Sequence, residues 1–334
     1  MNIFSRVLTA CVLIVLATTL TDCGSSKQQF ETDDNTVVVY NCNTEDWTAP
    51  IAKEFQEETG IRVKLVAGGS GELMARVRTE KEDPRGDVLW GGAADAYAAL
   101  TPCLEPYDSP EKTAIDPHFV RADNVFYSVT MDPFVLAYNT DLVSETDAPQ
   151  GWRDLLDPKF RGRIALADPV KTSSTYALLF TMTDVLGDAS VIGRLAEHLD
   201  GKVAAGSAAQ MKAVADGEYA VTATFEAAVM RYIDAGAHVK IVYPKEGTQI
   251  SSGGIAVLRN AKHMENAKKF LNFVMSKEVH ERFAQYDRRS TRADIPAPEN
   301  LRPLAEISFT RFDTQRAVSF RDEFLSKWRA AIIK

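Results

Sequence analysis

Alternating strand-like and helix-like segments near the start of the chain limit its fold more than any other feature. The strands are expected at residues 36–40, 61–66 and 87–90, with helices at 49–59 and 72–81. The first helix carries Ile51 and Phe55 four residues apart and stops at Gly60. Strand, helix and strand at this spacing predict parallel pairing with right-handed crossovers, so the expected class is α/β.

The alternation continues through the rest of the chain. A long extended run is expected at residues 126–139. Further strands are expected at 163–167, 219–224, 240–243 and 255–258, and helices at 152–156, 176–186, 191–199, 208–215 and 226–235. The tail beyond these segments is mostly helical. A length of 334 residues favours about two domains, each large enough to bury its own core.

Composition excludes several classes of protein. The chain is 45% hydrophobic and 25% charged, which is ordinary for a globular protein and unlike a disordered one. Its net charge of -8 argues against binding a nucleic acid through phosphate neutralisation. A small anion can still be bound, because the charge of a local site can differ in sign from the net charge of the chain. Five histidines and four cysteines show no zinc spacing, and we expect no metal and no cofactor.

The N-terminal segment predicts export. Residues 7–20 are almost wholly apolar or small and too short for a standard membrane span, but they suit the central part of a signal peptide. Leu20 stands three residues before Cys23, and a polar stretch follows, as in bacterial lipoproteins. Asp22 departs from that pattern, which has a small residue before the cysteine. We expect a signal peptide over 1–22, lipid attachment at Cys23 and a tether over 23–35; the alternative is an uncleaved anchor.

Cleavage before Cys23 leaves Cys42 and Cys103 as the remaining pair of cysteines. In an oxidising compartment they are expected either to form a disulfide or to remain as two buried thiols.

Several phrases resemble type II periplasmic solute-binding proteins of ABC importers. The phrases are residues 51–63, 152–165, 243–248, 253–256 and 266–276. They are most similar to the branch that holds ferric-ion, phosphonate and sugar-phosphate binders. The resemblance implies two α/β lobes of parallel-rich sheets flanked by helices, a ligand cleft between the lobes, and no catalysis.

The resemblance also implies a domain arrangement. Lobe 1 is expected over residues 36–132 and 253–300, and lobe 2 over 133–252 and 301–334, with the C-terminal helices packing on either lobe. The chain crossings are expected near 131–135 and 247–253. The partners are a membrane permease and a small anionic solute, and we expect a lipid-anchored monomer in the periplasm or on the outer face of the cell membrane.

Three polar turns mark the expected ligand site, because ligands of α/β sheets bind beyond the carboxyl ends of strands. The turns are residues 41–46, 68–71 and 171–175. The last two combine backbone N–H groups, small hydroxyls and a helix N-terminus, which suit an anion. The competing interpretation is helix capping. The predicted ligand residues are Asn43, Thr44, Gly69, Ser70, Gly71, Thr172, Ser173, Ser174, Ser207 and Glu226.

Glu226 follows a strand end and is expected to accept hydrogen bonds from sugar hydroxyls or to pair with an amine. The alternative is a first-turn acid favoured by the helix dipole.

The nature of the solute is inferred from the polar turns and from a missing motif. Ferric members of the branch usually hold the metal with adjacent tyrosines, and none of the ten tyrosines here is adjacent to another. The favoured ligand is therefore a sugar phosphate, then an aminophosphonate, then ferric ion. An exported hydrolase is a weaker alternative, since residues 69–71 lack the G-x-S-x-G pattern and no histidine can be assigned as a base. A sensory lipoprotein on the same fold is the other alternative.

Overall fold

The computed structural model describes residues 34–310 and 312–332. The chain divides into two units, Met1–Asp34 and Asn35–Lys334, and the second carries the fold. Cys23 and the predicted signal peptide lie outside the described residues. Within these described ranges, none of the helices combines the length and apolar content that a membrane span needs.

The described residues form ten strands and ten α-helices. The strands are β1 (Thr36–Asn41), β2 (Arg62–Ala67), β3 (Val88–Ala93), β4 (Tyr127–Asn139), β5 (Ile164–Ala165), β6 (Val221–Phe225), β7 (Val239–Val242), β8 (Thr248–Val257), β9 (Arg289–Ser290) and β10 (Phe309–Thr310). The helices are α1 (Glu45–Thr59), α2 (Ser70–Thr79), α3 (Ala94–Ala98), α4 (Ser173–Leu186), α5 (Val191–His198), α6 (Ser207–Ala215), α7 (Glu226–Asp234), α8 (Met264–Met275), α9 (Lys277–Arg282) and α10 (Thr314–Ile332).

The first three strands pair as the sequence predicts. β1 lies between β2 and β3 and runs parallel to both. The two connections are α1 and α2, so this segment is two consecutive strand–helix–strand units. Ile51 and Phe55 of α1 are buried, and α1 ends at Gly60, whose φ of 70° is the left-handed conformation that favours glycine. The predicted α/β class is confirmed.

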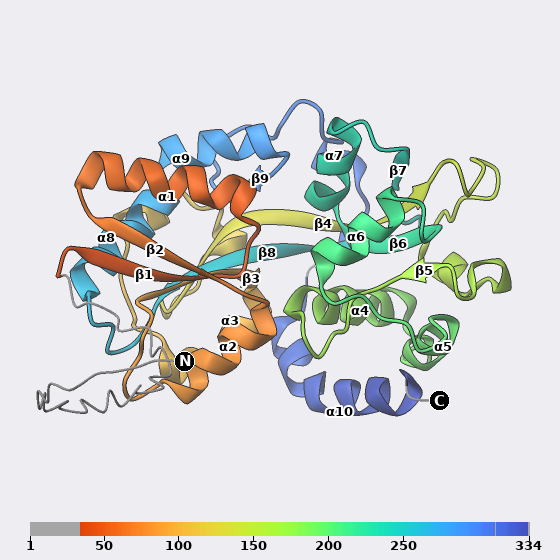
Figure 1. The fold of residues 1–334 in the computed structure, drawn as a ribbon, viewed down its shortest axis with the longest axis horizontal. Helices are drawn as coiled ribbons and strands as arrows, with labels where there is room; N and C mark the ends of the chain where they lie inside the picture. The colour runs from red at the N-terminus through yellow and green to blue at the C-terminus, as the bar shows by residue number, and fades with distance from the viewer. Residues whose placement is uncertain (1–33, 311, 333–334) are drawn as a thin grey trace, which may run out of the picture. The chain divides into compact units, whose positions relative to one another are not determined.

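Two long strands connect two groups of elements. β4 pairs with β8 and β9 in its first half and with β6 and β7 in its second half, antiparallel throughout. Figure 1 shows β4 and β8 running between a group formed around β1–β3 and a group formed around β5–β7. We call these groups lobe 1 and lobe 2. The sheet is more mixed than predicted, because β4 and β8 oppose their neighbours.

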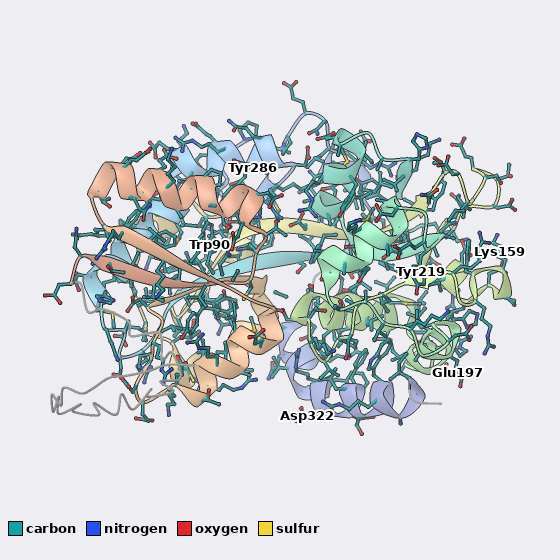
Figure 2. All side chains as sticks on the ribbon, in the orientation of Figure 1. Trp90, Lys159, Glu197, Tyr219, Tyr286 and Asp322 are labelled. Carbon is teal, nitrogen blue, oxygen red and sulfur yellow. The ribbon has the colours of Figure 1, made fainter. Side chains whose placement is uncertain are left out.

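Each lobe has its own buried apolar clusters. Lobe 1 packs Trp47, Phe55 and Phe270 around Trp90, which Figure 2 labels inside this lobe. Lobe 2 buries the face of α4 against α5 and α10, with Trp328 of α10 in the same cluster. The C-terminal helix therefore belongs to the core of lobe 2. The numerical lobe limits stay a prediction.

The main differences from the predicted elements lie at the helix starts and in β8. α1, α2 and α4 all begin earlier than expected. The first helical residue of α2 is Ser70, and that of α4 is Ser173. β8 begins at Thr248, well before the predicted strand, because residues from Ile250 onward pair with β4. The crossing segment expected near 247–253 is therefore part of an extended strand.

Candidate functional site

A cleft of about 820 Å³ lies between the lobes. This volume is within the range of small-molecule sites. Eight of the ten predicted ligand residues line it: Asn43, Thr44, Gly69, Ser70, Gly71, Thr172, Ser174 and Ser207. They come from the loop before α1 and from the starts of α2, α4 and α6. Residues more than 160 positions apart in the sequence therefore meet at one cleft.

The N-termini of α2, α4 and α6 are among those that meet at the cleft without a side-chain cap from their N-cap residues. The residues before α2, α4 and α6 are Gly69, Thr172 and Gly206, and none of these three caps its helix through a side chain. The first N–H groups of such helices lack intrahelical partners and carry partial positive charge. An anion placed among them would gain hydrogen bonds from N–H groups of both lobes.

The hydroxyls of Thr172, Ser174 and Ser207 bond to other groups than the helix N–H groups, whereas the Ser70 hydroxyl accepts from the N–H of Ser173 at the start of α4. Thr172 donates to the carbonyl of Asp168 at 3.3 Å and to the hydroxyl of Thr175 at 2.5 Å. The hydroxyls of Ser174 and Ser207 lie 3.2 Å apart, joining α4 to α6 at the cleft wall. The N–H groups of Ser173 and Gly71 already bond to the opposite lobe, so an anion would use the other N–H groups of these first turns.

Ser173 does not line the cleft, and its predicted ligand role is corrected here. It is buried, and both its N–H and its hydroxyl donate to the Ser70 hydroxyl at 3.0 Å. Its hydroxyl also accepts from the N–H of Ala93 at 3.2 Å. The N–H of Gly71 donates to the carbonyl of Lys171 at 3.1 Å. Ser173 therefore joins the lobes directly, and the structure shows them in contact.

Glu226 is also absent from the cleft wall, so its predicted role in binding sugar hydroxyls or an amine is corrected. Its carboxylate is fully buried and accepts from Arg289 of β9 at 2.6 and 2.9 Å. The Tyr243 hydroxyl donates to the same carboxylate. Burial and this carboxylate together raise the pKa of Tyr243. Glu226 thus belongs to a buried ion pair that links α7 of lobe 2 to β9 of lobe 1.

Two further ion pairs lie at the cleft. Arg231 of α7 contacts Asp46 of α1 at 3.1 Å, across the lobes. Arg288 lies 3.6 Å from Asp132 and stacks over the ring of Trp47, with its guanidinium carbon 4.4 Å from the ring centroid. Burial lowers the pKa of Arg288, and the nearby carboxylates oppose that shift. The sequence reasoning marked the turn of Asp46 but named none of these residues as ligands, and Asp132, Arg231 and Arg288 lie outside the three polar turns.

The buried carboxylate of Asp132 is the most unusual charged group of the cleft. Desolvation raises its pKa to about 6, while the positive charge of Arg288 opposes the shift. Its Oδ1 accepts one long hydrogen bond of 3.4 Å from the N–H of Ala227. Its position in β4, between an apolar run and Pro133, carries no sequence signal for a binding residue.

The described residues hold no group of three or more His, Cys, Asp or Glu side chains that could bind a metal. Tyr176 is buried and donates to the carbonyl of Ala317. Cys42 lines the cleft and Cys103 is buried, and both are free thiols. Burial raises the pKa of Cys42 to about 12. Of the two alternatives for this pair, the structure has thiols.

Three known proteins are similar to this chain. The periplasmic binding protein AfuA from Actinobacillus pleuropneumoniae, solved with bound exogenous fructose 6-phosphate, is 26% identical with a TM-score of 0.83, covering 89% of this chain and 98% of that one. A Salmonella typhi protein, named as a candidate 2-aminoethylphosphonate-binding periplasmic protein, is 27% identical over 242 residues, or 69% of each chain. The major ferric iron-binding protein of Neisseria meningitidis is 26% identical over 298 residues, covering 81% of this chain and 85% of that one.

These comparisons confirm the predicted two-lobed architecture and the predicted family. The family model described as bacterial extracellular solute-binding protein matches residues 50–307, which is more than half of the chain. The chain belongs to the family of bacterial extracellular solute-binding proteins.

Proposed function

We propose that the protein is the substrate-binding component of an ABC importer and captures a small solute carrying a phosphate or phosphonate. The observation that carries this proposal is the meeting at one cleft of the N-termini of α2 from lobe 1 and of α4 and α6 from lobe 2, whose N-cap residues supply no side-chain cap. A phosphoryl group offers three oxygens that accept hydrogen bonds from such groups. Binding would hold the lobes together by contacts from both sides.

The names of the similar proteins support this solute class. AfuA was solved with a phosphorylated sugar, and the Salmonella typhi protein is named for an aminophosphonate. A sugar phosphate remains the first choice and an aminophosphonate the second. The importer's permease would be the partner, and the protein would act as a monomer without turnover of the solute.

Export and membrane attachment complete the proposal. The apolar residues 7–20 and Cys23 support a lipid-anchored protein on the outer face of the cell membrane. The intact mass of membrane-extracted protein tests this: a chain that begins at a diacylated Cys23 supports the anchor, and a chain that begins at Met1 refutes cleavage.

Loss of a cleft hydroxyl is expected to weaken solute binding without weakening the fold. A hydrogen bond to a charged group contributes roughly 1.5–3 kcal/mol, so Ser174→Ala and Ser207→Ala should each reduce affinity about tenfold to a hundredfold. Calorimetric titration with fructose 6-phosphate and 2-aminoethylphosphonate measures the affinity, and thermal melting of the same samples measures stability. Ser190→Ala is the matched control, because Ser190 precedes α5 on an exposed surface.

The capping interpretation makes the opposite prediction for the same variants. Loss of a cap lowers stability by about 1 kcal/mol and leaves affinity unchanged. Variants of Ser174 and Ser207 that melt lower but bind both probes like the wild type would remove the anion site from α4 and α6.

Ferric ion is the alternative solute, favoured by the similarity to the Neisseria meningitidis protein. Tyr286 is the one tyrosine among the described residues of the cleft wall, and no two tyrosines are adjacent in the sequence. We therefore expect no intense visible absorption from tyrosinate–iron charge transfer when ferric citrate is added to the protein. A strong band that saturates at one iron per chain would favour the iron importer over the phosphate proposal.

A further inference from the structure

The carboxylate of Asp132 is buried at the cleft with unused capacity to accept hydrogen bonds. Only 7% of the residue is exposed, and it lines the cleft where β4 passes between the lobes. Its contacts are the long 3.4 Å bond from Ala227 and the 3.6 Å approach of Arg288, which exceeds hydrogen-bond length. An ionised carboxylate offers about four acceptor positions, so most of them are unused by the described residues.

The neighbouring guanidinium of Arg288 does not satisfy the hydrogen-bonding capacity of Asp132. The guanidinium of Arg288 stacks over Trp47, and its Nε is buried without a partner among the described residues. Arg289 and Glu226 also influence Asp132 electrostatically, but they bond to each other. A carboxylate buried with such partial compensation is destabilising unless another donor reaches it.

The position of Asp132 suggests which part of a solute would reach it. Asp132 stands opposite Ser251 in the pairing of β4 with β8, and Ser251 also lines the cleft. These two strands connect the lobes, whereas the N-termini without a side-chain cap from their N-cap residues belong to α2, α4 and α6. A negatively charged phosphoryl group would be repelled by Asp132, so this carboxylate suits a different end of the solute.

We propose that Asp132 determines specificity by accepting hydrogen bonds from hydroxyl or ammonium groups at the end of the solute remote from its phosphate or phosphonate. This inference rests on the proposed function, which places the anionic end at the helix N-termini. It gives Asp132 the role that the sequence suggested for Glu226. The solute must then carry donors at one end and a phosphoryl anion at the other.

The test compares Asp132→Asn with the wild type by calorimetric titration against four probes. Fructose 6-phosphate carries hydroxyl donors, 2-aminoethylphosphonate carries an ammonium, and ethylphosphonate and inorganic phosphate carry neither at a remote end. We expect the variant to lose about tenfold to a hundredfold in affinity for whichever donor-bearing probe the wild type binds. Its affinity for ethylphosphonate and inorganic phosphate should stay within about twofold of the wild type.

A second substitution, Asp132→Ala, distinguishes a solute that donates from a hydroxyl from one that donates from an ammonium. An amide oxygen still accepts from a hydroxyl but has no charge to attract an ammonium, so Asp132→Asn and Asp132→Ala should be equally weak for an ammonium solute. For a hydroxyl solute, Asp132→Asn should retain more affinity than Asp132→Ala. Asp322→Asn is the control for the change of net charge, because Asp322 is exposed on α10, outside the cleft (Figure 2).

Melting curves verify that the variant is folded. Folding raises the pKa of Asp132 to about 6, so stability linked to this group is fully present below about pH 4 and is lost as the pH rises through about 6. Asp132→Asn removes that loss and should melt no lower than the wild type at pH 7.5.

Two results would overturn the inference, and they differ from each other. If the wild type binds a donor-bearing probe and Asp132→Asn binds it equally well, the role of Asp132 is wrong while the proposed function stands. If the wild type binds none of the four probes, the proposed function fails and this inference fails with it.

Discussion

Gly71→Ala should reduce solute affinity by about fivefold to a hundredfold while leaving the unliganded protein as stable as the wild type. A Cβ at this position would lie 2.6 Å from the carbonyl oxygen of Lys171, a backbone atom of the opposite lobe. Overpacking of this kind costs about 1–3 kcal/mol, and here it is present only when the lobes touch. Alanine also suits the first turn of α2 better than glycine, so the substitution should not destabilise an unliganded form whose lobes are apart.

The measurements are calorimetric titration with the best phosphorus-bearing probe and small-angle X-ray scattering with and without that probe. The wild type should become more compact on binding, and the variant should not. Gly193→Ala is the matched control, since Gly193 lies in α5 with nothing within 4 Å of an added Cβ. If Gly71→Ala binds and compacts like the wild type, the contact between α2 and Lys171 is not part of the liganded state.

Arg289→Ala should be the most destabilising single substitution at the junction of the lobes. Arg289 and Glu226 are both fully buried, and removal of one partner leaves an uncompensated charge. The expected loss is about 3–5 kcal/mol, which lowers the melting temperature on the order of 10 °C in a chain of this size. Thermal and urea unfolding of the two proteins measure the difference.

The double variant Arg289→Met with Glu226→Leu provides the control, because replacing both charges by apolar groups is often close to neutral. It should recover most of the stability lost in Arg289→Ala. A different pattern would restore Glu226 as a ligand residue: Glu226→Gln would keep wild-type stability and lose solute affinity. The ion pair instead predicts that Glu226→Gln loses stability and retains most of its affinity.

Periodicity and turn chemistry were enough to predict most of the fold. The apolar run over 36–40, the helix ending at Gly60 and the crossovers led directly to β1, α1 and β2. The length of β8 could not be predicted, because Ser251, Ser252 and two glycines resemble a bend in isolation. They are extended because β4 pairs with them, and that partner is more than 100 residues away in the chain.

The hydroxyl and glycine positions at helix starts could be predicted from the sequence, whereas the roles of the single acidic residues could not. Hydroxyls and glycines at helix starts form local patterns, so Ser70, Thr172 and Ser174 could be named from the sequence, and they line the cleft. Glu226 was misplaced because a first-turn acid after a strand has a local explanation, whereas its partner lies 63 residues further along. Asp132 was missed because a single acid in an apolar strand shows its importance only through burial and neighbours.

The measurement that tests the central claim most directly is a calorimetric titration of the mature chain with matched pairs of solutes. Each pair sets a phosphorus-bearing compound against its phosphorus-free counterpart, such as fructose 6-phosphate against fructose and 2-aminoethylphosphonate against ethanolamine, with ferric citrate included. The account predicts one site per chain for at least one phosphorus-bearing solute and no measurable binding of its counterpart. Tighter binding of a phosphorus-free solute or of ferric ion than of every phosphorus-bearing solute would contradict it.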